Sequence, residues 1–194
     1  MILRRPDRPR LTALSVALSL LSGVPFAAGC GGDDGSASRP PDYESALRGS
    51  PRELAALHDQ AGELLDGGAG EFEARLEELR GYPVVVNKWA SWCAPCRSEF
   101  PYFQSQAAKR GTEVAFIGVN SNDGEETAAR FLDELPVPYP SYFDPRLEVA
   151  ATFDAPTEFP ATAFYDSEGE LVHVRRGTYA SEEELAADIE RYAR

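Results

Sequence analysis

The spacing of apolar positions changes character along the chain. Apolar residues recur at three- and four-residue steps over 52–65 and again over 71–79, which predicts two amphipathic helices. The glycine-rich run 67–70 is expected to separate them. From residue 83 onwards, short apolar runs rich in β-branched residues alternate with further helical patterns. The pattern therefore predicts an extra N-terminal helical segment over 50–80, followed by an α/β domain.

The rest of the chain supplies the elements of that domain. The apolar runs at 83–88 and 113–119 are typical of buried strands. Helices are expected at 125–135, 146–153 and 182–192, and a hairpin at 160–166 and 170–176. Ser181 and Glu184 have the spacing of a capping box, which marks the start of the last helix. We therefore expect a single domain, with a central mixed sheet flanked by helices on both faces.

The N-terminus has the order of an export signal. Basic residues up to Arg10 precede the apolar stretch 11–21, and a run of small residues ends at Cys30. Ala27-Ala28-Gly29-Cys30 resembles the bacterial lipobox, in which the cysteine carries the lipid. The alternatives are a retained membrane helix, for which the apolar stretch is shorter than the ~20 residues needed, and ordinary cleavage that leaves Cys30 as a free thiol. All three place the domain outside the cytoplasm.

These features predict three parts. Residues 1–29 are expected to be a lipoprotein-type signal peptide. Residues 30–42 comprise the lipidated Cys30 and a flexible linker, because the stretch lacks the large apolar residues that would offset its ordering entropy. Residues 43–194 are expected to form the folded domain, in which the helical segment 50–80 precedes the main α/β part at 82–194. The lipid would anchor the protein to the outer face of the bacterial cell membrane.

Charge and composition exclude several classes of function. The formal net charge is −13, and loss of the basic leader would make it more negative. A surface this acidic repels phosphate backbones, so no nucleic-acid partner is expected. The chain has three cysteines and two histidines, and His58 and His173 stand alone. Because a structural zinc site needs four ligands, no such site is expected. No organic or other metal cofactor is implied by the sequence either.

The motif Cys93-Ala94-Pro95-Cys96 directly follows the predicted strand at 83–88 and a short tryptophan-containing turn. A cysteine at the start of a helix meets free backbone N–H groups, which favour its thiolate. Cys96 lies one turn further on, where it can resolve a mixed disulfide formed by Cys93. The alternatives are half of a zinc site and an inert disulfide. The ligand count argues against the first, and the short loop argues against the second, because closing it constrains the unfolded chain little.

Residues 85–101 resemble the active-site stretch of thioredoxin-fold proteins and, more narrowly, of the TlpA/ResA-like thiol–disulfide oxidoreductases. Asn87 stands where thioredoxin carries a buried aspartate. Glu99 matches the acidic residue beside the cysteines in the narrower group. The resemblance implies a redox-active Cys93–Cys96 disulfide in a thioredoxin-like fold.

The resemblance extends to 159–169, where it implies that Pro160 is a cis-proline facing the dithiol. Two features depart from the group. Phe159 is bulkier than the usual residue before this proline, so a relative's substrate preference does not transfer. The helical segment over 50–80 stands where such proteins often begin with a hairpin. In the fold, the substrate-contacting positions correspond to Trp92, Ala94, Pro95 and Phe159.

Two interpretations of Glu99 are open at this point. It is either a solvated helix carboxylate or a partly buried acid that accepts the proton of Cys96. Trp92 is expected to shield the sulfurs and Trp89 to lie in the core. Thioredoxin-fold peroxidases need a threonine shortly before the attacking cysteine, and the residues from Trp89 to Trp92 contain none.

The sequence thus predicts a monomeric, extracytoplasmic oxidoreductase that reduces protein disulfides through Cys93 and Cys96. For the TlpA/ResA-like group the commonest role is cytochrome c maturation, and electrons would come from a thiol-transferring membrane protein. One alternative is an oxidase that donates disulfides to secreted proteins. The other is a non-catalytic module that binds peptides on a thioredoxin scaffold.

Overall fold

The computed structural model describes residues 40–194. The predicted signal peptide, Cys30 and most of the predicted linker lie outside these residues. The centre of the fold is a six-stranded sheet with the order β1-β4-β3-β2-β5-β6. Its strands are β1 (Leu64–Leu65), β2 (Val84–Trp89), β3 (Ala115–Ser121), β4 (Ser141–Asp144), β5 (Ala161–Tyr165) and β6 (Leu171–Arg176).

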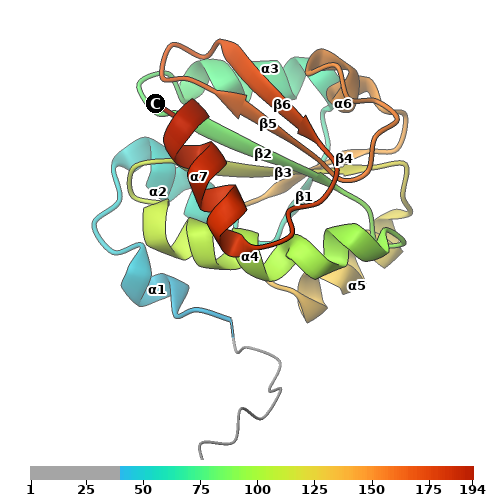
Figure 1. Cartoon of the computed structure of the whole chain (residues 1–194), viewed down its shortest axis with the longest axis horizontal. Helices are drawn as coiled ribbons and strands as arrows, with labels where there is room; N and C mark the ends of the chain where they lie inside the picture. Colours follow the sequence, from blue (N-terminus) through green and yellow to red (C-terminus); the bar gives the residue numbers. More distant parts are fainter. Residues whose placement is uncertain (1–39) are drawn as a thin grey trace, which may run out of the picture. The chain divides into compact units, whose positions relative to one another are not determined.

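Helices cover both faces of this sheet, as the sequence predicted. They are α1 (Tyr43–Ala46), α2 (Arg52–His58), α3 (Gly68–Glu78), α4 (Ala94–Arg110), α5 (Glu125–Glu134), α6 (Glu148–Thr152) and α7 (Glu182–Tyr192). In Figure 1, α3 and α6 lie along one side of the sheet, and α4 and α5 along the other, with α7 next to α4.

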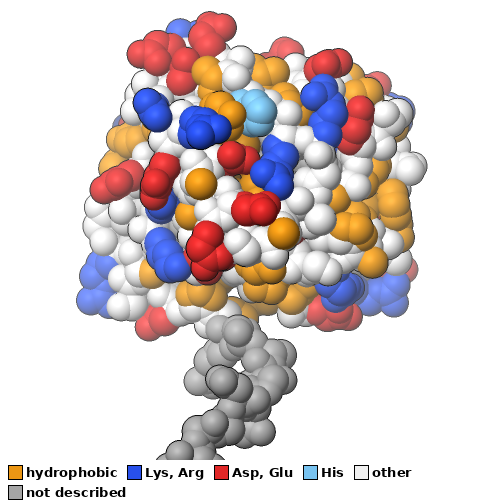
Figure 2. Space-filling view, viewed as in Figure 1, with side chains coloured by type: hydrophobic (Ala, Val, Ile, Leu, Met, Phe, Trp, Pro, Cys, Tyr) orange, Lys and Arg blue, Asp and Glu red, His pale blue; other side chains and the backbone are white. Residues whose placement is uncertain are grey.

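Charged side chains of both signs intermingle on the face shown in Figure 2, with apolar patches between them.

Alternation along the strands divides the core into two clusters. On β2, Val85 and Trp89 face the cluster that contains the apolar side chains of α4, α5 and α7. Val84 and Val86 face the opposite cluster, formed with α2, α3 and α6. All six residues of β2 are buried. A central strand covered on both faces explains why its sequence is a nearly continuous apolar run.

The directions of the strands decide which loops meet at one edge of the sheet. β1, β4, β3 and β2 run parallel, whereas β5 is antiparallel to β2 and β6 is antiparallel to β5. The carboxyl ends of β2 and β3 therefore lie at the same edge of the sheet as the start of β5. This edge brings together the turn after Trp89, the loop after Ser121 and the peptide before Ala161.

The N-terminal segment differs from the prediction. The helix expected over 52–65 ends at His58, and Leu64–Leu65 forms the edge strand β1, which pairs in parallel with β4. Two leucines in a row fit a helix face and a short strand equally well, and pairing with a distant strand decides between them. The glycine run 67–70 does not simply separate two helices, because α3 begins at Gly68.

The C-terminal elements agree closely with the prediction. β5 and β6 form the expected antiparallel hairpin. Ser181 caps α7, and its hydroxyl accepts a hydrogen bond from the Glu184 N–H. The Glu184 carboxylate accepts from the Ala180 N–H rather than from Ser181 itself. No helix within residues 40–194 is long and apolar enough to cross a membrane.

Candidate active site

The two cysteines lie at the junction of β2 and α4. Cys93 is the N-cap of the 17-residue helix α4, and its Sγ accepts a hydrogen bond from the Cys96 N–H at 3.2 Å. The two residues form a disulfide, with Cα atoms 5.3 Å apart. Cys93 is 3% exposed and Cys96 is fully buried. Cys93 thus lies at the start of a helix, as the spacing predicted, and free backbone N–H groups at such a position favour a thiolate over a thiol.

Aromatic packing beneath the turn holds this junction in place. Trp89 is fully buried, as expected, and stacks on Phe131 of α5 with ring centroids 4.7 Å apart. The Trp89 ring also forms a T-shaped pair with Phe100 of α4, with ring centroids 5.4 Å apart. The Trp89 Nε1–H donates to Ser141 Oγ on β4. Because these contacts tie β2, α4 and α5 together, they set the position at which the cysteines enter the helix.

Asp123 fastens the active-site turn to the loop after β3. Its carboxylate accepts hydrogen bonds from the backbone N–H and the hydroxyl of Ser91 and from the Asn120 side-chain amide. Burial opposes ionisation, but hydrogen bonds from Asn120, Ser91 and the Gly124 N–H leave the pKa of Asp123 below its ordinary value. The sequence gives no signal for this role of Asp123, because Ser91 lies 32 positions away from it.

Glu99 is fully buried on α4, so the interpretation as a solvated helix carboxylate is wrong. Its Oε2 accepts hydrogen bonds from the Tyr179 N–H at 2.9 Å and from the Thr178 hydroxyl at 3.1 Å. Its Oε1 has no hydrogen-bond partner within the described residues. Burial raises the pKa of Glu99 to about 7, although both hydrogen bonds and Arg175 lower it. A carboxyl with this pKa can accept or release a proton near neutral pH.

The segment before β5 lies at the same edge of the sheet. The Phe159–Pro160 peptide bond is cis, and Ala161 pairs with Lys88 of β2. The centroids of the Phe159 and Trp92 rings lie 4.8 Å apart. Trp92 is 56% exposed, and its Nε1–H donates to the Asn122 carbonyl. Trp92 is thus a surface side chain that packs against Phe159.

The other predicted contact positions also lie at the surface. Ala94 and Pro95 are exposed on the first turn of α4, whereas Pro160 is buried. Asn87, the residue at the position of the thioredoxin aspartate, is buried on β2, and neither polar atom of its side chain has a hydrogen-bond partner within residues 40–194. An asparagine side chain cannot take up a proton as a carboxylate does, so Glu99 is the candidate for proton transfer at the dithiol.

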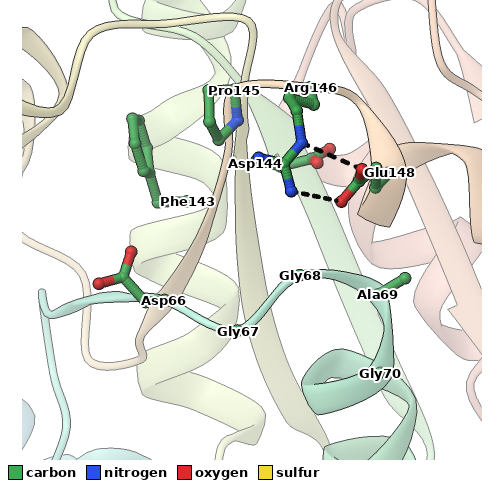
Figure 3. Close-up of a pocket in the computed structure, with 10 residues that line it drawn as sticks. All are labelled: Asp66, Gly67, Gly68, Ala69, Gly70, Phe143, Asp144, Pro145, Arg146 and Glu148. Atoms are coloured by element: carbon green, nitrogen blue, oxygen red, sulfur yellow. Dashed lines mark hydrogen bonds and ion pairs between the residues drawn. The ribbon is translucent and has the colours of Figure 1, made fainter.

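A pocket of about 490 Å³ at the end of β4 is separate from the cysteines. The glycine-rich start of α3 forms one wall, and Arg146 and Glu148 form another. Figure 3 shows the Arg146 guanidinium directed at the Glu148 carboxylate, to which it donates two hydrogen bonds of 3.0 Å. The pocket lining contains neither cysteine. In the described part of the chain, no group of three or more cysteine, histidine or acidic residues could hold a metal.

Comparisons with known proteins bear on this site. Residues 53–174 match the model of the AhpC/TSA family. The thiol-disulfide oxidoreductase ResA of Halalkalibacterium halodurans is 32% identical over 130 residues, which cover 65% of this chain and 72% of that protein. The thiol:disulfide interchange protein DsbE of Escherichia coli K12 is 36% identical over 137 residues, which cover 70% of this chain and 65% of that protein.

Solved structures agree with these matches. A structure of MTB DsbF in mixed oxidised and reduced forms aligns with a TM-score of 0.55 and 34% identity, over 59% of this chain and 84% of that one. The observed mixed sheet with helices on both faces is thus the thioredoxin-like fold that the motif predicted. The family match includes the disulfide at the start of α4. The chain belongs to the AhpC/TSA family, and it is similar to the thiol-disulfide oxidoreductase ResA and the thiol:disulfide interchange protein DsbE.

Proposed function

We propose that this protein reduces disulfides of exported proteins through the Cys93/Cys96 dithiol. The observation that carries the proposal is the joint position of three groups on α4. The Cys93 sulfur caps the helix, Cys96 lies one turn further on, and the buried Glu99 follows at the next turn. This arrangement supplies a nucleophile, a resolving thiol and a proton acceptor.

The reaction follows from the roles of these groups. The Cys93 thiolate attacks one sulfur of the substrate disulfide, which breaks, and the other substrate sulfur leaves as a thiolate and takes up a proton. Cys96 then gives its proton to Glu99 and attacks the Cys93 sulfur, which releases the second substrate thiol. Two electrons pass to the substrate, and the protein is left with the Cys93–Cys96 disulfide. A partner dithiol protein in the membrane reduces it again.

The site favours this activity over the two alternatives. A peptide-binding module has no need of a helix-capping sulfur or of a buried acid whose pKa is raised to about 7. Reduction rather than oxidation is supported by the combination of the dithiol with Glu99, which resembles the reducing TlpA/ResA-like group. That resemblance also makes apo-cytochrome c a candidate substrate.

A turnover assay tests the direction of transfer. The reduced protein, regenerated by a small dithiol, is offered insulin with intact disulfides, and the oxidised protein is offered a reduced, unfolded secretory protein. We expect insulin reduction to be the faster reaction. Faster oxidation of the unfolded protein would assign it to the disulfide donors, and no exchange in either assay would favour the binding module.

We propose further that the domain is held at the outer face of the cell membrane by a lipid on Cys30. The support is the sequence order of basic, apolar and small residues before Cys30. Expression of the Cys30→Ala variant, followed by membrane fractionation, tests this. The variant is expected in the soluble extracytoplasmic fraction, and retention of the variant in the membrane would rule out the anchor.

A further inference from the structure

Lys88 is a fully buried lysine on the central strand β2. It lies on the same face of the strand as Val84 and Val86, where an apolar side chain would complete the core. The chain's other lysine, Lys109, has a side chain that is 61% exposed and pairs with Glu182. Burying an ammonium group is costly unless hydrogen bonds replace its water. The partners of Lys88 therefore indicate what the charge does.

The ammonium group donates both of its hydrogen bonds within the described residues to the segment that leads into Pro160. The Nζ donates to the Glu158 carbonyl at 2.7 Å and to the Pro156 carbonyl at 3.1 Å. It also lies 3.6 Å from the centroid of the Phe159 ring. Burial lowers the pKa of Lys88 to about 8, against the opposing effects of Glu158 and Asp144, so the charged form predominates at neutral pH.

Phe159 links the buried Lys88 to Trp92 at the surface. The Phe159 ring packs against Trp92, which directly precedes Cys93 and is itself held by the Asn122 carbonyl. Trp92 is 56% exposed, and Phe159 is half-buried between it and the lysine. The two rings thus form an apolar surface next to the active-site turn. The Trp92 ring is held by its hydrogen bond to the loop after β3, and the Phe159 ring is held by its contact with the Lys88 ammonium group.

We propose that Lys88 is a positioning residue for substrate recognition: it holds Phe159 against Trp92, and the two rings select disulfides that have a large apolar side chain beside the cysteine. The inference rests on the proposed reductase activity and names its substrate class. The chemistry is unchanged, because Cys93 forms the mixed disulfide and Cys96 resolves it. An aromatic side chain on the substrate gains contact area with the two rings before this exchange, so the preference appears mainly in KM.

Two peptides with an internal disulfide, one with Phe and one with Ser beside each cysteine, provide the test, with dithiothreitol to regenerate the dithiol. We expect the protein to reduce the Phe peptide with a kcat/KM about tenfold higher, at the lower end of what an apolar contact contributes. In Lys88→Met, which keeps the length of the side chain and removes its charge, the ratio should fall to about one through a higher KM for the Phe peptide. Lys109→Met is the matched control and should keep the ratio.

The other outcomes separate the hypotheses. A preserved ratio in Lys88→Met, or an equal fall in kcat for both peptides, would overturn the positioning role. If Lys88→Met does not fold, Phe159→Ala decides, because retention of the preference without the ring contradicts the inference. Equal reduction of both peptides by the unaltered protein removes this inference alone. Reduction of neither peptide removes the proposed function and this inference with it.

Discussion

Replacing Cys93 with serine is expected to abolish disulfide reduction, and replacing Cys96 with serine should trap the reaction halfway. A serine hydroxyl is not a nucleophile towards disulfides at neutral pH, so Cys93→Ser should show no exchange above background. Cys96→Ser keeps the helix-capping thiol and loses the group that resolves the mixed disulfide. This variant should accumulate a covalent adduct with the substrate, visible by mass spectrometry and released by a small thiol.

The asymmetry between the two variants is the informative part of this prediction. Cys30→Ser serves as the control, because it changes the one cysteine outside the motif, and its disulfide reduction should match that of the unaltered protein. If Cys93→Ser instead forms the adduct and Cys96→Ser does not, the roles of the two cysteines are reversed. Thermal unfolding of each variant in the reduced state shows whether the fold is intact.

Glu99→Gln is expected to slow the resolving step by about 10²- to 10⁴-fold, the range typical of a lost general acid–base group. Glutamine is close to glutamate in size and cannot accept the Cys96 proton. Because burial raises the pKa of Glu99 to about 7, the rate of the unaltered protein should rise with pH through an inflection near this value. Stopped-flow tryptophan fluorescence from pH 5 to 9 should show that the inflection is lost in the variant.

The same carboxyl predicts how stability depends on pH. The pKa is about 7 in the folded protein and near its ordinary value of 4.5 in the unfolded chain, so the folded state binds the proton more tightly. This contribution to the free energy of unfolding is fully present below pH 4.5 and is lost as the pH rises through 7. It amounts to about 3 kcal/mol. Glu99→Gln should lack this decrease in urea unfolding, whereas the exposed Glu73→Gln should retain it. An equal pH dependence in all three proteins would contradict the buried acid.

The parts of the fold that sequence predicted well are those with strong local signals. The β-branched run of β2, the cysteine spacing at the start of α4 and the Ser181 cap each depend on neighbours within a few residues. Glu99 could be named as a candidate proton acceptor because it matches the acidic residue beside the cysteines in the TlpA/ResA-like group. Its burial could not be decided, because the groups that cover and bind it belong to another part of the chain.

Long-range contacts account for what was missed. The Tyr179 N–H that binds Glu99 is 80 positions away, and Asp123 reaches Ser91 across 32. Lys88 stands in an apolar strand, and its carbonyl partners lie 68 and 70 positions further on. The edge strand at Leu64–Leu65 differs from the predicted helix for the same reason, because within residues 40–194 it is paired only with the distant strand β4. Such pairings follow from the topology of the sheet and leave no periodic signal in the sequence.

The reduction potential of the Cys93/Cys96 couple tests the central claim most directly. The protein with Cys30 replaced by serine is equilibrated with thiol buffers of known potential, and Trp92 fluorescence reports the redox state. A reductase predicts a value near or below about −220 mV, towards the roughly −270 mV of thioredoxin. A value near about −120 mV, that of the strongly oxidising DsbA, would show a disulfide donor and contradict the proposed direction of electron transfer.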